Sequence, residues 1–235
     1  MRVAPNPSLS CSFCGFASPQ SVPGAIPKPR FRLGASTQPA RSVSVSTPTT
    51  SATAEESATP TVTSRRRLIL LRHGESAFAG RFTKDHDRPL SQVGRNDAIS
   101  ISHKLEQMGW IPELILSSNA TRTKETLEIL REKIKGLNQA KVHFIPSFYS
   151  IAAMDGQTAA HLQKAICEFS TDEISTVMCM GHNKGWEEAA SMFSGDPVEL
   201  KTCNAALLEA SGQSWMEAFS VAGLGGWKLH GILKP

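Results

Sequence analysis

Cysteine is scarce in this 235-residue sequence, which contains only five, too few for a disulfide framework. Cys11 and Cys14 form a CxxC pair, but no second pair with metal-ligand spacing follows, so no zinc site is expected. Cys167, Cys179 and Cys203 are scattered among apolar residues and are expected to be buried thiols. Neither a disulfide-stabilised secreted domain nor a zinc-dependent protein is therefore predicted.

Long apolar runs are also lacking, which excludes a predicted secretory signal or membrane-spanning helix. Residues 1–64 contain only two acidic residues and five basic ones, but 20 serines and threonines and nine of the 14 prolines. A Ser-rich, acid-poor segment is typical of an organelle transit peptide; an ordinary disordered tail is the alternative. Because its prolines oppose an amphipathic helix, we expect the chloroplast stroma as destination, with the mitochondrion as the alternative.

Residues 65–235 have little net charge, with 20 basic and 19 acidic residues. A domain this close to neutrality does not suggest nucleic acid or an anionic membrane as its partner. Three arginines, Arg65 to Arg67, precede the first apolar run and are expected to be solvated. We therefore predict two parts, a disordered transit peptide at 1–64 and a single compact domain at 65–235.

Strand-like and helix-like segments alternate along this domain. Short aliphatic runs predict buried strands at 68–71, 114–116, 142–145, 176–180, 205–209 and 227–232. Helical periodicity and capping residues predict helices at 92–108, 121–135, 158–169 and 184–193. The alternation predicts an α/β fold, with a mostly parallel sheet flanked by helices on both faces.

Chemically capable residues follow three of the predicted strands. Arg72, His73 and Gly74 follow the first, Arg122 starts the helix after the second, and His182 follows the fourth. Ligands of such sheets bind at the carboxyl ends of the strands, so these residues are expected to converge. Two guanidiniums match a phosphoryl group, and an imidazole beside them is a candidate nucleophile or acid/base. The pattern predicts a phosphoryl site without metal or organic cofactor, but does not choose between the histidines.

Four stretches carry a family resemblance: LILLRHGES at 68–76, DRPLSQVGR at 87–95, SSNATRTKET at 117–126 and VMCMGHNKGWEE at 177–188. Together they resemble the histidine phosphatase superfamily, also called phosphoglycerate mutase-like. The resemblance implies that His73 accepts the phosphoryl group and that Arg72 and Arg122 bind its oxygens. It also implies that His182 stabilises the transition state, while Gly74 is expected to let the backbone approach the phosphate.

The proton donor is the element that the sequence lacks. Mutases and many phosphomonoesterases of the superfamily carry a glutamate after the third strand, but the segment 145–162 contains none. Asp155 is its only carboxylate and is interpreted first as a turn residue before Gly156; Glu75 is the other candidate donor. A missing acid suits phosphohistidine, because imidazole leaves with less protonation than an alkoxide. This feature and the short domain resemble the SixA-like phosphohistidine phosphatases, although Lys184 stands where proline is expected.

The predicted function is a SixA-like phosphatase that hydrolyses a phosphoryl group through a covalent intermediate on His73. Its expected partner is a phosphorylated protein, with phosphohistidine as the favoured substrate, or a small phosphorylated molecule. Two alternatives stay open. One is a small-molecule phosphomonoesterase using Asp155 or Glu75 as acid, and the other is a catalytically silent protein that binds a phosphorylated ligand.

Overall fold

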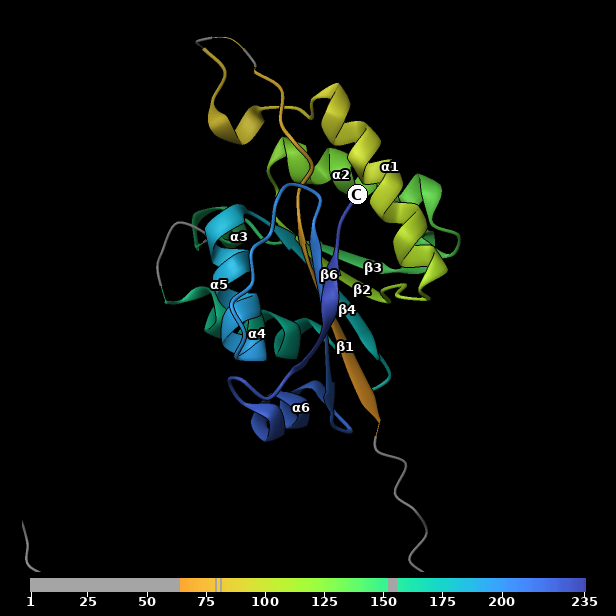
Figure 1. The fold of residues 1–235 in the computed structure, drawn as a ribbon, viewed down its shortest axis with the longest axis vertical. Coiled ribbons are helices and arrows are strands. Elements are labelled where there is room, and N and C mark those ends of the chain that lie inside the picture. Colours follow the sequence, from red (N-terminus) through yellow and green to blue (C-terminus); the bar gives the residue numbers. More distant parts are fainter. Residues whose placement is uncertain (1–63, 79, 81, 152–155) are drawn as a thin grey trace, which may run out of the picture. The chain divides into compact units, whose positions relative to one another are not determined.

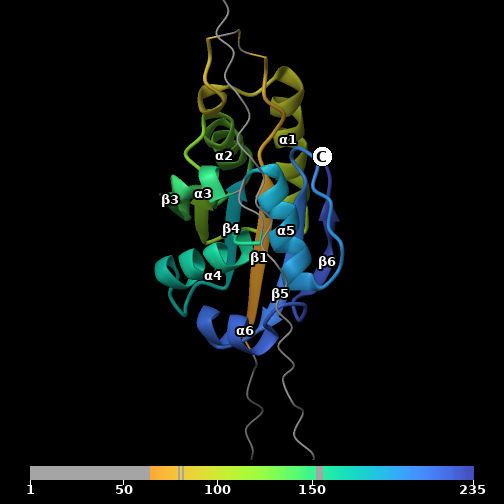
Figure 2. The ribbon, with the colours of Figure 1, turned by 90° about the vertical axis from the view of Figure 1, so that its left-hand side faces the viewer.

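The computed structural model describes residues 64–78, 80, 82–151 and 156–235, all within one unit, Ser57–Pro235. These residues form a six-stranded sheet with the order β3-β2-β4-β1-β5-β6. Figure 2 shows β3, β4, β1, β5 and β6 in this order across the sheet. The strands are β1 (Arg65–Arg72), β2 (Leu114–Ser117), β3 (Lys141–Phe144), β4 (Thr176–Gly181), β5 (Ala205–Ser211) and β6 (Lys228–Leu233). The first four are mutually parallel, and β5 and β6 complete the sheet in antiparallel pairing. The predicted α/β fold is confirmed.

Helices cover both faces of this sheet (Figure 1). The helices α1 (Gln92–Gln107) and α2 (Thr121–Lys133) lie on one face, and α3 (Ser147–Ile151), α4 (Thr158–Phe169), α5 (Asn183–Ser194) and α6 (Trp215–Ala222) pack on the other. Two short 3-10 helices, η1 (Asp85–Asp87) and η2 (Leu137–Gln139), complete the described elements. Sequence periodicity predicted the four longer helices, but not α3, α6 or the 3-10 helices.

Strand β1 is buried on both faces, which explains its continuous aliphatic run. Leu68 and Leu70 pack into the core under α4, α5 and α6, while Ile69 and Leu71 pack into the core under α1. Strand β1 lies between β4 and β5, and its last residue, Arg72, pairs with Gly181 at the end of β4. The carboxyl ends of β1, β2 and β4 therefore lie at one edge of the sheet.

The expectation for the arginine run is wrong at Arg66, which is only 2% exposed. Its guanidinium donates to the backbone carbonyls of Gly212 at 3.1 Å and Ile174 at 2.7 Å. These carbonyls supply the acceptors that a buried guanidinium requires, and they come from segments more than 100 residues away in the chain. Arg67, one residue further, pairs with Glu209 of β5. The strand alternation places Arg66 and Arg67 on opposite faces of the sheet.

The described cysteines are free thiols, and two of the three are buried as predicted. Cys179 and Cys203 are buried free thiols, and Cys167 is partly buried. All four tryptophans are buried in the core: Trp110, Trp186, Trp215 and Trp227. No helix among the described residues is long and apolar enough to cross a membrane.

Candidate active site

The strand ends bring His73, Arg122 and His182 into direct contact. His73 follows β1, Arg122 lies in the first turn of α2 after β2, and His182 is the N-cap of α5 after β4. The Nε of Arg122 lies 3.1 Å from Nε2 of His73, and a terminal nitrogen of Arg122 lies 3.3 Å from Nδ1 of His182. The two imidazole rings are 5.0 Å apart between centroids. All three side chains are buried, so their interactions are little screened by water.

One hydrogen bond fixes the tautomer of His73. Its Nδ1 lies 2.6 Å from the carbonyl oxygen of Gly74, which can only accept a hydrogen bond. The proton therefore sits on Nδ1, and Nε2 presents a lone pair that accepts from Arg122. The His73 backbone is held on both sides, because its N–H donates to Gly181 and its carbonyl accepts from Cys203, each at 3.1 Å. The reactive lone pair of this imidazole is thus on Nε2 and points at a guanidinium.

Both histidines are held neutral. Burial lowers the pKa of His73 to about 4, and the charges of Arg122 and Arg72 act in the same direction. Burial also lowers the pKa of His182 to about 3, with His73 and Arg122 as further causes. A neutral imidazole retains the lone pair that a nucleophile requires.

Arg72 has one buried N–H group, on Nε, without a hydrogen-bond acceptor among the described residues. One terminal nitrogen donates to Oδ1 of Asn183 and to the carbonyl of Leu200, both at 2.7 Å. Its Nε is buried without a hydrogen-bond partner among the described residues. Burial lowers the pKa of Arg72, the charge of Glu187 raises it and the charge of Arg122 lowers it. Buried donors are rarely left unpaired, so this Nε marks a place suited to an anionic ligand.

Gly74 lies where the loop after β1 packs against α1. A Cβ on Gly74 would lie 2.8 Å from the carbonyl oxygen of Gly94, in the first turn of α1. The reverse contact is tighter, since a Cβ on Gly94 would lie 2.2 Å from the carbonyl oxygen of Glu75. The Gly74 N–H donates to the hydroxyl of Thr126 at 3.0 Å. Backbone packing therefore requires glycine at both positions.

Of the two candidate proton donors, the structure describes Glu75, whose hydrogen bonds go to the start of α1. Glu75 is exposed, and its carboxylate accepts from the hydroxyl of Ser91 at 2.8 Å. Its backbone carbonyl accepts from the Ser91 N–H, so the residue ties the loop after His73 to the N-cap of α1. Asp155 lies outside the described residues.

Asp85 and Tyr149 complete the site, and sequence reasoning missed both. Terminal nitrogens of Arg122 donate to the backbone carbonyl of Asp85 at 2.5 Å and to its Oδ2 at 2.9 Å. The Tyr149 hydroxyl donates to the same Oδ2 at 3.0 Å, and its ring meets His182 edge-on at 5.2 Å. Asp85 precedes the DRPLS motif and Tyr149 lies in the segment searched for glutamate, but neither sequence pattern indicated a contact with Arg122.

Ser118 fixes the orientation of the second histidine. A guanidinium only donates, so Nδ1 of His182 accepts from Arg122. Nε2 of His182 then carries the proton and donates to the Ser118 hydroxyl at 2.9 Å. Ser118 belongs to the SSNATRTKET stretch, whose predicted contribution was Arg122 alone.

A cavity of about 590 Å³ opens beside these residues. Asp85, Arg122, Tyr149 and His182 line it, together with Ser150, Asn183 and Lys184. Lys184, the residue expected to be proline in SixA-like sequences, is exposed at its rim. The cavity provides space for a leaving group next to Arg122 and His182.

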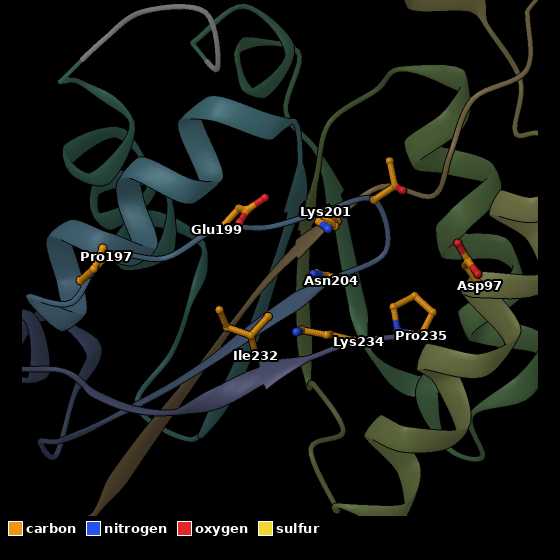
Figure 3. Close-up of a pocket in the computed structure, with 9 residues that line it drawn as sticks. Asp97, Pro197, Glu199, Lys201, Asn204, Ile232, Lys234 and Pro235 are labelled. Atoms are coloured by element: carbon orange, nitrogen blue, oxygen red, sulfur yellow. The ribbon is translucent and has the colours of Figure 1, made fainter.

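A second cavity of about 590 Å³ contains none of the predicted site residues (Figure 3). Its lining comes from segment 197–204, the end of β6 and Asp97 of α1, and carries charges of both signs. No group of three or more His, Cys, Asp or Glu residues is placed to hold a metal ion in the part of the chain that the structure describes.

An imidazole with an unprotonated Nε2, set among two arginines and a second histidine, suits phosphoryl chemistry. Residues 68–169 match the family described as the histidine phosphatase superfamily (branch 1), a range that includes His73 and Arg122. The chain belongs to the histidine phosphatase superfamily.

One curated protein and two solved structures are similar to this chain. An uncharacterized chloroplastic protein of Arabidopsis thaliana is 58% identical over 192 residues, 82% of this chain and 88% of that protein. A proposed SixA phosphohistidine phosphatase of Agrobacterium tumefaciens has a similar structure, with a TM-score of 0.55, 24% identity, and coverage of 72% of this chain and 98% of that one. The protein histidine phosphatase SixA complexed with tungstate has a TM-score of 0.56, 18% identity, and coverage of 72% and 97%. At these identities the two structures establish a shared fold.

Proposed function

We propose that this chain is a phosphatase that transfers a phosphoryl group to Nε2 of His73 and then hydrolyses the phosphohistidine. The observation that carries the proposal is the neutral His73, whose Nδ1 is protonated and whose Nε2 lone pair faces Arg122. Membership of the histidine phosphatase superfamily supports it. A SixA structure of the same fold is complexed with tungstate, a tetrahedral oxyanion, which supports anion binding by this fold.

In the first step, the Nε2 lone pair forms a bond to phosphorus while the bond to the leaving group breaks. Arg122 and the unpaired Nε of Arg72 donate to the phosphoryl oxygens and stabilise the charge of the transition state. A bound phosphoryl dianion raises the pKa of His182, so that this residue becomes a further donor. The proposed roles use the four residues that the sequence predicted.

The Gly74 contact also favours turnover of the intermediate. Because Nδ1 keeps its proton, phosphorylated His73 carries an imidazolium-like ring. When water attacks phosphorus, the pair of the N–P bond returns to Nε2 and the ring leaves as neutral imidazole. A neutral leaving group makes the second step easier than expulsion of an imidazolate.

Phosphohistidine in a protein is the proposed substrate class. The described residues provide no protonated carboxylic acid at the site, since hydrogen bonds from Tyr149 and Arg122 outweigh burial and lower the pKa of Asp85. An alkyl ester would have to leave as an alkoxide without such an acid, whereas the imidazole of phosphohistidine needs less help.

Leaving-group dependence tests this class of substrate. We expect kcat/KM for a phosphohistidine peptide and for phosphoramidate to exceed that for an alkyl phosphate by about 100-fold or more, the lower range of general-acid effects. Comparable values for alkyl phosphates would contradict the phosphohistidine preference and favour a small-molecule phosphomonoesterase.

We further propose that residues 1–64 are a transit peptide that directs the phosphatase domain, residues 65–235, to the plastid. Their Ser- and Thr-rich, acid-poor composition supports this proposal. The chloroplastic assignment of the Arabidopsis relative, which is 58% identical, supports it independently.

A further inference from the structure

Asp85 lies at the phosphoryl site without an assigned role. It belongs to η1, and its Oδ2 accepts from both Arg122 at 2.9 Å and Tyr149 at 3.0 Å. Its Oδ1 accepts from Arg88 at 3.3 Å. Asp85 also lines the same cavity as Arg122 and His182. Among the described residues lining that cavity, it is the one with a carboxylate.

Arg122 links this carboxylate to the reactive nitrogen. Its Nε faces His73, whereas its two terminal nitrogens face Asp85. The guanidinium thus contacts the imidazole and the carboxylate through different nitrogens. A phosphoryl group that is attached to Nε2 and bound by Arg122 would therefore lie close to Asp85.

We propose that Asp85 is the general base of the second step, accepting a proton from the water that attacks phosphorylated His73. The inference rests on the proposed function, because it requires the phosphohistidine intermediate. As the water oxygen bonds to phosphorus, one of its protons passes to the Asp85 carboxylate. The N–P bond breaks, its electron pair returns to Nε2, and Nδ1 keeps its proton. Hydrogen phosphate leaves, and Asp85 releases its proton to solvent.

The surroundings of Asp85 suit a base better than an acid. Arg122 from α2, Tyr149 from α3 and Arg88 from the following loop each donate to its carboxylate, and all three contacts favour the ionised form. Although burial raises the pKa of Asp85, these hydrogen bonds lower it by more. An ionised carboxylate cannot protonate a leaving group, but it can accept a proton from water.

Tyr149 is then a positioning residue for this base. Its hydroxyl donates to Oδ2, and its ring packs edge-on against His182. Burial and the hydrogen bond to Asp85 raise the pKa of Tyr149, so the hydroxyl stays protonated and remains a donor. Removal of the hydroxyl should misplace the carboxylate without removing its basicity.

The competing role for Asp85 is that of an occupant of Arg122, displaced when a phosphoryl group binds. An occupant competes with the substrate, so its removal would tighten binding and leave hydrolysis of the intermediate unchanged. A base acts after the first step, so its removal would slow hydrolysis and leave formation of the intermediate in place. The two roles therefore differ in the step that changes.

The test measures formation and decay of the phosphoenzyme separately in the full chain. The protein is labelled with radioactive phosphoramidate, chased with unlabelled reagent, and quenched in base at timed intervals. For Asp85→Asn we expect label to form and then decay about 100-fold more slowly than in wild type. Asparagine still accepts from Arg122 and Tyr149, which preserves the geometry. Added formate, a small carboxylate, should restore part of the decay rate.

Asp87→Asn is the matched control, since it removes the same charge from the same 3-10 helix but contacts His86 rather than Arg122. We expect the label on Asp87→Asn to decay at the wild-type rate. For Tyr149→Phe we expect decay about 10-fold slower than in wild type, a smaller effect than that of Asp85→Asn, because the base itself remains. Wild-type decay in Asp85→Asn, or slower labelling with unchanged decay, would overturn the inference while the proposed function stands. Absence of label on the wild-type protein would instead overturn the proposed function.

Discussion

His73 and His182 are buried, neutral imidazoles, and this state makes the stability of the fold depend on pH. An unfolded histidine has a pKa of about 6.5, whereas burial and nearby arginines lower the pKa of His73 to about 4 and that of His182 to about 3. At pH values between the folded-state and unfolded-state pKa values of these histidines, the unfolded chain binds more protons than the folded one. The free energy of unfolding therefore falls as the pH falls from about 6.5 toward 4.

Urea unfolding at pH 7 and pH 5 measures this effect. We expect wild type to lose stability between the two values, and His73→Gln to lose less, because one of the two depressed pKa values is gone. The free energy of unfolding at pH 5 is compared with that at pH 7 for the same protein, so any pH-independent destabilisation by the substitution cancels. A wild-type free energy that is equal at both pH values, or that rises at pH 5, would contradict neutral buried histidines.

Arg122 shows why a charge alone does not define this site. Its Nε contacts His73, and its terminal nitrogens contact His182 and Asp85, an arrangement that needs the planar fork of a guanidinium. For Arg122→Lys we expect the rate of labelling of His73 to fall by about 100-fold, within the range for losing one donor to a transition state. Arg131→Lys on the same helix, whose guanidinium contacts Asn138, is expected to label normally.

At the scale of elements, α1 is positioned by direct contact with the loop that follows His73. Gly94 lies so close to Glu75 that a Cβ would overlap the Glu75 carbonyl oxygen. Gly94→Ala should therefore push the loop and α1 apart, destabilising the fold by about 1–3 kcal/mol and slowing labelling of His73. Thermal unfolding and the labelling rate measure the two effects. Asn96→Ala, on the exposed side of the same helix, should leave both nearly unchanged.

Elements with a long repeating pattern were predictable from the sequence. The strand β1 was visible as a continuous aliphatic run, and α1, α2, α4 and α5 were visible through their helical periodicity. The helix α3 has five residues and η1 has three, too short for a period to be read. The sequence therefore located His73, Arg122 and His182, which follow predictable strands, but not Asp85 and Tyr149, which lie on these short elements.

Arg66 shows a second limit of prediction at this scale. Three consecutive arginines favour a solvated segment, but the acceptors for Arg66 are backbone carbonyls of Gly212 and Ile174, far along the chain. No local pattern indicates such partners. Only the pairing of β1 with β4 and β5 places them around its guanidinium.

For the whole described domain, function depends on the order of the strands. Strands β1, β4 and β2 are neighbours in the sheet, so residues at their carboxyl ends meet although 109 positions separate His73 from His182. The alternation of strands and helices predicted a parallel sheet but not this order. The convergence was expected because these residues follow parallel strands at their carboxyl ends, and the sheet order supplies its geometric cause.

For the whole chain, residues 1–64 and 65–235 are proposed to have separate roles. Residues 1–64 fused to a fluorescent reporter should direct it to plastids in plant cells, as the composition of this segment predicts. The matched control is the reporter fused to residues 65–235. Reporter in mitochondria, or throughout the cytosol, would contradict the plastid proposal without affecting the chemistry at His73.

The proposed function depends on phosphorylation of His73 at Nε2, and this phosphoenzyme can be trapped chemically. The full chain is mixed with labelled phosphoramidate and quenched in base, where phosphohistidine survives, and the modified residue is located by mass spectrometry and phosphorus NMR. We expect a phosphoryl group on Nε2 of His73 in the wild type and none in His73→Ala. No label on the wild type, equal label on His73→Ala, or a phosphoryl group on His182 would contradict it.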